Sequence, residues 1–275
     1  TLLSKIGEIM SKQMLIDATH PEETRVVVLE NGRVEELDVD TNIKKQIKGN
    51  IYLAKVVRVE PSLQACFVEY GGNRHGFLAF GEIHPDYYQI PVADREELKR
   101  QIAEAESAKA AAKEEETPEQ KEDSDVELVR ESDETLRHHR PAVLKKYKIQ
   151  EVIHTGQVML VQAVKEERGN KGAAMTTYLS LAGRFSVLMP NNSHGGGVSR
   201  KISNGKDRKE LRKIVDKLPI PEGMSVIIRT AGQGKTKSEI KRDYDYLIKT
   251  WSHIRELTLK SIAPKLIHEE GDIIK

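Results

Sequence analysis

The sequence predicts a β-rich, mixed α+β fold, in which a small five-stranded barrel carries a long acidic insertion and is followed by an α+β region. Three observations predict it. Short β-branched runs bounded by turn residues recur between residues 51 and 181, a long stretch without aromatic residues separates the third run from the fourth, and an apolar face at helical spacing follows at 236–262. Five strands are about the number that closes a small barrel.

Length and cysteine content limit the class of protein. A chain of 275 residues is expected to form about two domains. No apolar run approaches the roughly 18 residues that a membrane-spanning helix needs, so a transmembrane protein is excluded. The single cysteine, Cys66, can form neither an internal disulfide nor a cysteine-based zinc site. A reducing cytoplasm is therefore the expected location.

The net charge of +1 averages two opposed segments. Residues 114–134 hold eleven acidic and two basic side chains, whereas residues 184–260 hold seventeen basic and eight acidic ones. The acidic stretch lies in a region without aromatic residues from 89 to 146, so we expect it to be disordered or transiently helical. The basic region indicates a surface that binds a polyanion, with a solvated helical face as the alternative.

The strands are predicted from alternation and turn signals. Residues 14–16 and 24–30 are β-branched runs, and 34–39 follows the hairpin signal Asn31-Gly32. Barrel strands are predicted at 51–59, 65–70, 75–80, 157–164 and 176–181, and the segment from Tyr88 to Tyr147 is interpreted as an insertion.

The α+β region is predicted from two further strands and two helices. The strands are expected at 185–189 and 225–230, and the helices at 207–218 and 236–262. The apolar face of the longer helix repeats every three or four residues. Trp251 is interpreted as an anchor of that face rather than as a base-stacking residue. The face comprises Ile240, Tyr244, Leu247, Ile248, Trp251, Ile254 and Leu257.

Two sets of residues could contact nucleic acid. Phe67 and Phe77 lie on adjacent predicted strands beside Arg74 and His75, and exposed aromatic rings on a barrel stack on bases. The alternative is that both rings fill the barrel core. The loop 165–172 places glycines around Lys171, which alone is a weak signal for phosphate contact.

A second candidate lies where a strand meets a helix. The run 232–236 reads Gly-Gln-Gly-Lys-Thr, but Arg229 stands where a P-loop needs glycine, so an NTPase is disfavoured. Arg229, Thr230 and the following turn instead bring a guanidinium, a hydroxyl and backbone N–H groups together, which suits a terminal phosphate. The alternative is an ordinary helix entry with a salt-bridged arginine. No histidine spacing indicates a metal site, and no nucleophile–base set is evident.

Seven sequence runs resemble the N-terminal part of the ribonuclease E/G family, and are most similar to its ribonuclease E members. Their order and spacing match from about Met10 onward, apart from the insertion, which resembles that of alphaproteobacterial members. The runs are GNIY at 49–52, VEPSLQACFV at 59–68, RHGFL at 74–78, KEERGNKG at 165–172, TTYLSLAG at 176–183, VLMPNN at 187–192 and IRTAG at 228–232.

The resemblance implies a division of the chain. Residues 10–45 would be N-terminal strands of an RNase H-like subdomain, and 46–177 an OB-fold of the ribosomal protein S-one type with its insertion at about 89–146. Residues 178–262 would form a 5′-sensor subdomain. Residues 263–275 would begin the return to the RNase H-like subdomain, where the chain is expected to stop short. Residues 1–9 precede the usual family start and receive no function.

The resemblance also implies site residues. By motif position, Phe67, Phe77 and Lys171 fall where the family's OB-fold binds single-stranded RNA.

The remaining four positions fall on the family's 5′-sensor pocket: Gly183, Val187, Arg229 and Thr230. There Arg229 and Thr230 would hydrogen-bond a 5′-monophosphate, and Val187 would pack against the terminal base.

The activity implied is that of an endoribonuclease that hydrolyses single-stranded RNA in mRNA decay and in rRNA and tRNA processing. The full-length family uses Mg²⁺ for cleavage and structural Zn²⁺ to link a homotetramer, and both sites lie C-terminal to Lys275 in family order. We therefore expect no catalytic residue and no metal ligand in this chain. It would bind RNA with a 5′-monophosphate, as a cytoplasmic monomer, without cutting it. The full-length protein would lie peripherally at the inner membrane.

An alternative from another class is a standalone RNA-binding or scaffold module that recruits a degradosome protein, such as a helicase, through residues 103–136. Val126, Leu128 and Val129 form an apolar patch within this acidic run. A scaffold would bind RNA independently of 5′ phosphorylation, whereas a sensor would not.

Overall fold

The computed structural model describes residues 12–20, 23–41, 46–91, 94, 100, 147–167, 171–192 and 196–270. The chain divides into two compact units, one of which holds the N-terminal strands and the other residues 48–270. The upstream residues 1–9, the acidic insertion from residue 101 to residue 146 and the segment 271–275 lie outside the described residues.

The N-terminal unit contains a three-stranded antiparallel sheet in the order β1-β2-β3, formed by β1 Lys12–His20, β2 Glu23–Glu30 and β3 Arg33–Thr41. Asn31 and Gly32 both have positive φ, 53° and 76°, as a two-residue hairpin turn of the primed type requires. The predicted hairpin is therefore confirmed.

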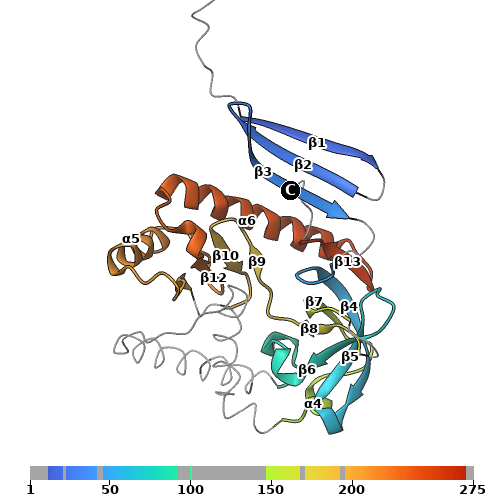
Figure 1. Cartoon of the computed structure of the whole chain (residues 1–275). Helices are drawn as coiled ribbons and strands as arrows, with labels where there is room; N and C mark the ends of the chain where they lie inside the picture. The colour runs from blue at the N-terminus through green and yellow to red at the C-terminus, as the bar shows by residue number, and fades with distance from the viewer. Residues whose placement is uncertain are drawn as a thin grey trace, which may run out of the picture. The chain divides into compact units, whose positions relative to one another are not determined.

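The barrel is built from β4 Ile51–Glu60, β5 Ala65–Glu69, β6 Gly76–Ala79, β7 Val158–Lys165 and β8 Ala174–Thr176. The strand order β4-β5-β6-β8-β7 closes on itself, because β7 also pairs with β4 (Figure 1). The β6–β8 pair is parallel, and the other pairs are antiparallel. This closed five-stranded barrel confirms the predicted OB-fold.

Short helices complete the barrel. They are η2 Pro61–Leu63, η3 Phe80–Glu82, η4 Pro85–Tyr87 and α4 Ile149–Val152. The insertion begins later than predicted, because Tyr88 and Ile90 are buried in the barrel and the hydroxyl of Tyr88 donates to the carbonyl of Ile83 (3.0 Å). The chain that enters the insertion is therefore fixed to the barrel as far as Ile90.

The fifth barrel strand differs from the prediction. A strand was expected at 176–181, but β8 ends at Thr176 and the next strand, β9 Leu181–Ala182, belongs to another sheet. Residues 177–180 between them alternate in burial like a strand, yet the amides of Leu179 and Ser180 donate to side chains instead of to a neighbouring strand.

The α+β subdomain consists of a four-stranded sheet and two helices. Its strands β9, β10 Ser186–Met189, β11 Gly197–Val198 and β12 Ser225–Ile228 lie in the order β11-β12-β10-β9. The helices are α5 Gly205–Val215 and α6 Lys237–Leu259, and α6 lies along this sheet (Figure 1). The last described strand, β13 Lys265–His268, returns to the barrel and pairs with the first half of β4.

Helix α6 confirms the predicted apolar face. Ile240, Tyr244, Leu247 and Ile254 are buried, and Trp251 packs against the same cluster, in agreement with its interpretation as an anchor. None of the described helices has the length and apolar character that crossing a bilayer requires.

One hydrophobic cluster extends from the barrel into the subdomain. It contains Ile51 and Leu160 of the barrel, Leu188 and Ile228 of the second sheet, and Ile267 of β13. The two parts of this unit therefore share a core.

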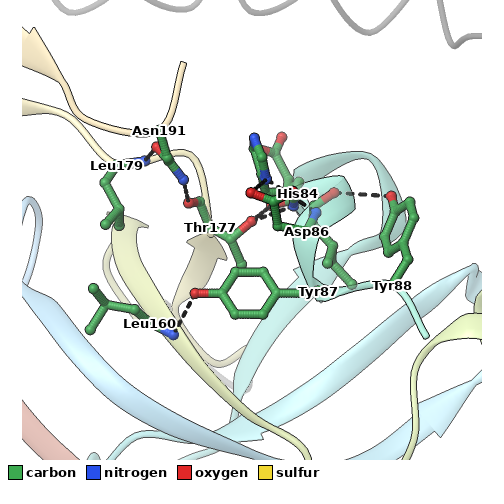
Figure 2. A network of polar contacts seen from close by, with 10 residues as sticks. His84, Asp86, Tyr87, Tyr88, Leu160, Thr177, Leu179 and Asn191 are labelled. Carbon is green, nitrogen blue, oxygen red and sulfur yellow. Dashed lines mark hydrogen bonds and ion pairs between the residues drawn. The ribbon is translucent and has the colours of Figure 1, made fainter. Parts of the chain in front are cut away.

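The connector at residues 177–180 is held from both sides (Figure 2). On the barrel side, the hydroxyl of Thr177 accepts a hydrogen bond from the His84 amide (2.6 Å) and donates to the Glu82 carbonyl (2.8 Å). On the other side, the Asn191 side chain accepts from the Leu179 amide (2.9 Å) and donates to the Thr177 carbonyl (2.6 Å). Buried polar backbone is thus satisfied without a sheet partner.

A buried side chain completes the connector. The Gln162 amide nitrogen donates to the carbonyls of Gly49 and Ser180, both at 2.8 Å, and its oxygen accepts from the Ser180 amide at 2.8 Å. Because Gln162 lies on β7, it ties the connector directly to the barrel.

Candidate functional site

The two barrel phenylalanines lie directly opposite each other on β5 and β6. Their ring centroids are 5.9 Å apart and their planes cross at 70°, an edge-to-face contact. Their strand neighbours Cys66, Val68 and Leu78 are fully buried, whereas Phe67 and Phe77 are partly exposed. Since side chains alternate across a strand, the two rings lie on the outer face of the barrel and not in its core.

One basic residue contacts this aromatic pair, and others lie on the chain next to the strands that carry it. The exposed Arg58 is paired with Phe67 across β4 and β5, and its guanidinium carbon lies 4.8 Å from the ring centroid. Lys171 is exposed and lies in the loop between β7 and β8. The next residue, Gly172, lies so close to the β6 entry that an added Cβ would meet the His75 carbonyl oxygen at 1.9 Å. The backbone beside Lys171 is therefore packed against the exposed turn at Arg74 and His75.

We call Arg58, Phe67, Phe77 and Lys171 the barrel strip. A partly exposed aromatic pair flanked by cations matches the pattern with which barrels bind single-stranded nucleic acid, in which bases stack on rings and cations track phosphates.

A second cluster is built around Arg229, at the end of β12. One guanidinium nitrogen, Nη1, donates to the carbonyl of Gly183 at 2.7 Å, and the backbone N–H of Arg229 donates to the carbonyl of Phe185 at 2.8 Å. Among the described residues, the recorded acceptor of this guanidinium is thus a carbonyl, so the alternative of a salt-bridged arginine does not describe it. The contact fixes the position of the fork and uses one of its five N–H donors.

The carboxylate of Asp243, on α6, organises the turn that carries Gly183. It accepts hydrogen bonds from the amides of Arg184 (2.9 Å) and Phe185 (3.1 Å) and from the hydroxyl of Ser186 (2.6 Å). A Cβ at Gly183 would lie 2.7 Å from both carboxylate oxygens, so this approach requires glycine. Asp243 therefore sets the place of the carbonyl that holds Arg229.

The other two predicted residues flank this arginine. Thr230 is partly exposed and begins the short helix η5 Thr230–Gly232. Val187 lies in the middle strand, paired with Ile227 and Ala182, and is only 8% exposed. The structure thus brings Gly183, Arg229 and Thr230 to one end of the sheet and leaves Val187 little surface for contact with a ligand.

The Gly-rich run that follows does not form a phosphate loop. The hydroxyl of Thr236 accepts from the amide of Glu239 (3.3 Å) and donates to its carboxylate (2.8 Å), while that carboxylate accepts from the amide of Thr236 (2.9 Å). This is a capping box at the start of α6. The hydroxyl that would bind a metal–nucleotide complex is committed to the helix.

The cysteine thiol and the metal-ligating side chains of the described residues do not form a reactive site. Burial raises the pKa of the Cys66 thiol to about 12, so it remains protonated at neutral pH, as expected of a small apolar core residue. No group of three or more His, Cys, Asp or Glu side chains suited to a metal ion occurs in the part of the chain that the structure describes.

Comparison with known proteins identifies the relatives of this arrangement. The model of the ribonuclease E/G family matches residues 180–275. Ribonuclease E of Escherichia coli strain K12 is 39% identical over 263 residues, which cover 96% of this chain and 20% of that protein. Ribonuclease E of Haemophilus influenzae is 38% identical over 263 residues, which cover 96% of this chain and 23% of that protein. The chain belongs to the ribonuclease E/G family.

Both branches of the ribonuclease E/G family are represented. Ribonuclease G of Escherichia coli strain K12 is 30% identical over 247 residues, which cover 90% of this chain and 40% of that protein. The chain thus spans between a fifth and a quarter of the length of the two ribonuclease E relatives.

Three residues of these sites were missed by sequence reasoning. Arg58 could have been found by counting across the 61–64 turn, because antiparallel pairing places it opposite Phe67. Phe185 and Asp243 carry no comparable signal, since their roles arise from the approach of α6 and β12 to one turn.

Proposed function

We propose that this chain is the RNA-binding and 5′-monophosphate-sensing part of an endoribonuclease that acts on single-stranded RNA in mRNA decay and stable-RNA processing. In this proposal, bases stack on Phe67 and Phe77 while Arg58 and Lys171 contact phosphates. The 5′-monophosphate binds at Arg229 and Thr230, and the terminal base contacts the small part of Val187 that is exposed. The alternative scaffold function depends on Val126, Leu128 and Val129, which lie outside the described residues.

The observation that carries the proposal is the fixed position of Arg229. Its guanidinium is anchored to the Gly183 carbonyl, which Asp243 in turn holds through its contacts with the turn. An arginine held this way presents a fork of donors that fits a phosphate, and little side-chain entropy is lost on binding. Anchoring of this kind favours recognition of one phosphate group over general attraction to a polyanion.

The test is binding of one short single-stranded RNA with a 5′-monophosphate, a 5′-hydroxyl or a 5′-triphosphate to the full chain. Wild type should prefer the monophosphate, and Arg229→Ala should lose that preference, by about 10- to 100-fold for hydrogen bonds to a charged group. The matched control is Arg255→Ala, which removes an exposed arginine further along α6. It should keep the preference. Equal affinity of wild type for all three ends would refute 5′ sensing by this chain.

A further inference from the structure

Phe185 lies directly opposite Arg229. Its carbonyl accepts the Arg229 amide at 2.8 Å, which extends the β10–β12 ladder by one step beyond the Ser186–Ile228 pair. Ser186 and Ile228 are fully buried on the α6 side of the sheet. By alternation, the side chains of Phe185 and Arg229 lie on the opposite face, which they share with Val187.

Two cations flank the Phe185 ring. The guanidinium carbon of Arg184 lies 5.6 Å from the ring centroid, and Nζ of Lys235 lies 5.2 Å from it. The ring is partly exposed, and both cationic residues are exposed. The same combination of an aromatic ring and a cation occurs in the barrel strip, where Arg58 covers Phe67.

This face therefore offers more apolar surface at Phe185 than at Val187, which is 8% exposed. The two residues are separated by one pleat repeat, roughly 7 Å along the strand. An RNA whose terminal base contacts Val187 and whose 5′-phosphate binds Arg229 has its next nucleotide within reach of the Phe185 ring. Its phosphodiester then lies near Arg184 and Lys235.

We propose that Phe185, with Arg184 and Lys235, forms a subsite for the second nucleotide of the RNA, in which the base stacks on the ring and the two cations contact the backbone phosphate. This inference rests on the proposed function, because it assumes that the 5′ end lies at Arg229. It assigns a ligand contact to a residue that neither the motifs nor the family resemblance indicates.

The test compares 5′-monophosphorylated RNAs that are intact, abasic at position 1 or abasic at position 2, with wild type and Phe185→Leu. Leucine keeps an apolar side chain that can cover the sheet but cannot stack. Phe185→Leu should weaken binding of intact RNA by about 5- to 150-fold, the range for loss of one stacked base. It should have no further effect on RNA abasic at position 2. The subsite would be overturned if Phe185→Leu weakened binding of all three RNAs equally. It would also be overturned if the weakening disappeared only for the RNA that is abasic at position 1.

Controls separate this inference from the proposed function. Tyr246→Leu removes an exposed aromatic residue of α6 and should leave all affinities unchanged. Thermal unfolding shows whether Phe185→Leu remains folded, and Lys235→Gln, which keeps the ring, should lower the salt dependence of log K by about one. If Arg229→Ala keeps the preference for a monophosphate while Phe185 still couples to position 2, the proposed role of Arg229 fails and the contact of Phe185 with the second nucleotide stands. If Phe185→Leu shows no coupling to position 2 while Arg229→Ala loses the preference for a 5′-monophosphate, the subsite is refuted and the proposed function stands.

Discussion

At the scale of the residue, Asp243 organises the turn beside Arg229 although it is not expected to touch RNA. Its carboxylate satisfies two backbone amides and one hydroxyl in the turn 183–186. Backbone donors gathered around an anion normally form a binding site for a ligand anion. Here the protein supplies that anion itself, so the proposed site assigns the phosphate to the side chains of Arg229 and Thr230 and not to these amides.

We predict that Asp243→Asn weakens discrimination between 5′-monophosphate and 5′-hydroxyl RNA, because an amide nitrogen would face an N–H donor and displace the Gly183 carbonyl. The loss in the free energy of unfolding should be about 1.5–3 kcal/mol, as for a hydrogen bond to a charged group. Urea unfolding and RNA binding measure the two effects. Asp245→Asn, on the same helix and in an exposed ion pair with Lys241, serves as the control. Identical behaviour of the two variants would contradict this role.

At the scale of the element, the capping box in the first turn of α6 stabilises the helix. Hydrogen bonds from Thr236, chiefly from its backbone N–H, lower the pKa of the Glu239 carboxyl below its usual 4.5. A carboxyl group whose pKa is lower in the folded state stabilises the fold above its unfolded pKa. That contribution is lost as the pH falls through the folded pKa. The capping box should therefore contribute at neutral pH and not in strong acid.

Thr236→Ala is expected to cost about 1 kcal/mol of unfolding free energy at pH 7, the usual effect of losing an N-cap side chain. Glu239→Gln should destabilise the protein at pH 7, and its difference from wild type should shrink as the pH falls through the lowered pKa of the Glu239 carboxyl. Urea titrations at pH 7 and at a series of acidic pH values measure this. Thr250→Ala, which removes a mid-helix hydroxyl bonded to the Tyr246 carbonyl, should cost less than Thr236→Ala. A Glu239→Gln effect that grows with acid would contradict the assignment.

Elements with local signals were predictable from sequence. The hairpin follows from Asn31-Gly32, and the buried face of α6 follows from its apolar spacing, because both depend on neighbours in the chain. The fifth barrel strand was misplaced because residues 176–181 are rich in β-branched, aromatic and apolar side chains, as is typical of a strand. The partners of Thr177 and Leu179 are instead the barrel backbone and Asn191. Long-range side-chain contacts of this kind leave no periodic trace.

The candidate sites show the same limit. The motif residues Phe67, Phe77 and Arg229 were identified because aromatic and basic side chains near turns are visible in the sequence. Arg58 and Phe185 become candidates only when strand register places each opposite one of them.

At the scale of the whole molecule, the barrel and the α+β subdomain form one body. They share a hydrophobic cluster, and Gln162 and Asn191 hold the connector from either side. The barrel strip and the Arg229 cluster consequently lie at a fixed separation. An RNA that contacts both must be long enough to span it.

We predict that the effect of Phe67→Ala on RNA affinity depends on the length of the RNA, whereas the effect of Arg229→Ala does not. On short 5′-monophosphorylated RNAs, Arg229→Ala should weaken binding and Phe67→Ala should not. Above a threshold length, Phe67→Ala should also weaken binding, by about 1–3 kcal/mol for one stacked base. Titration of a series of RNAs that increase by one nucleotide measures the threshold, and thermal unfolding checks that Phe67→Ala remains folded. A Phe67 effect that is the same at every length would contradict a fixed separation.

The pairing of β13 with β4 has a consequence for the order of folding. The five barrel strands are complete once Thr176 has been synthesised, yet the edge of β4 at Ile51–Leu53 receives its partner only when residues 265–268 emerge. Contacts between segments so distant in sequence form slowly. Until β13 has paired with it, the unpaired edge of β4 is a site at which chains can aggregate. During synthesis, the pairing of β13 with β4 therefore removes the edge at which the first barrel strand could aggregate.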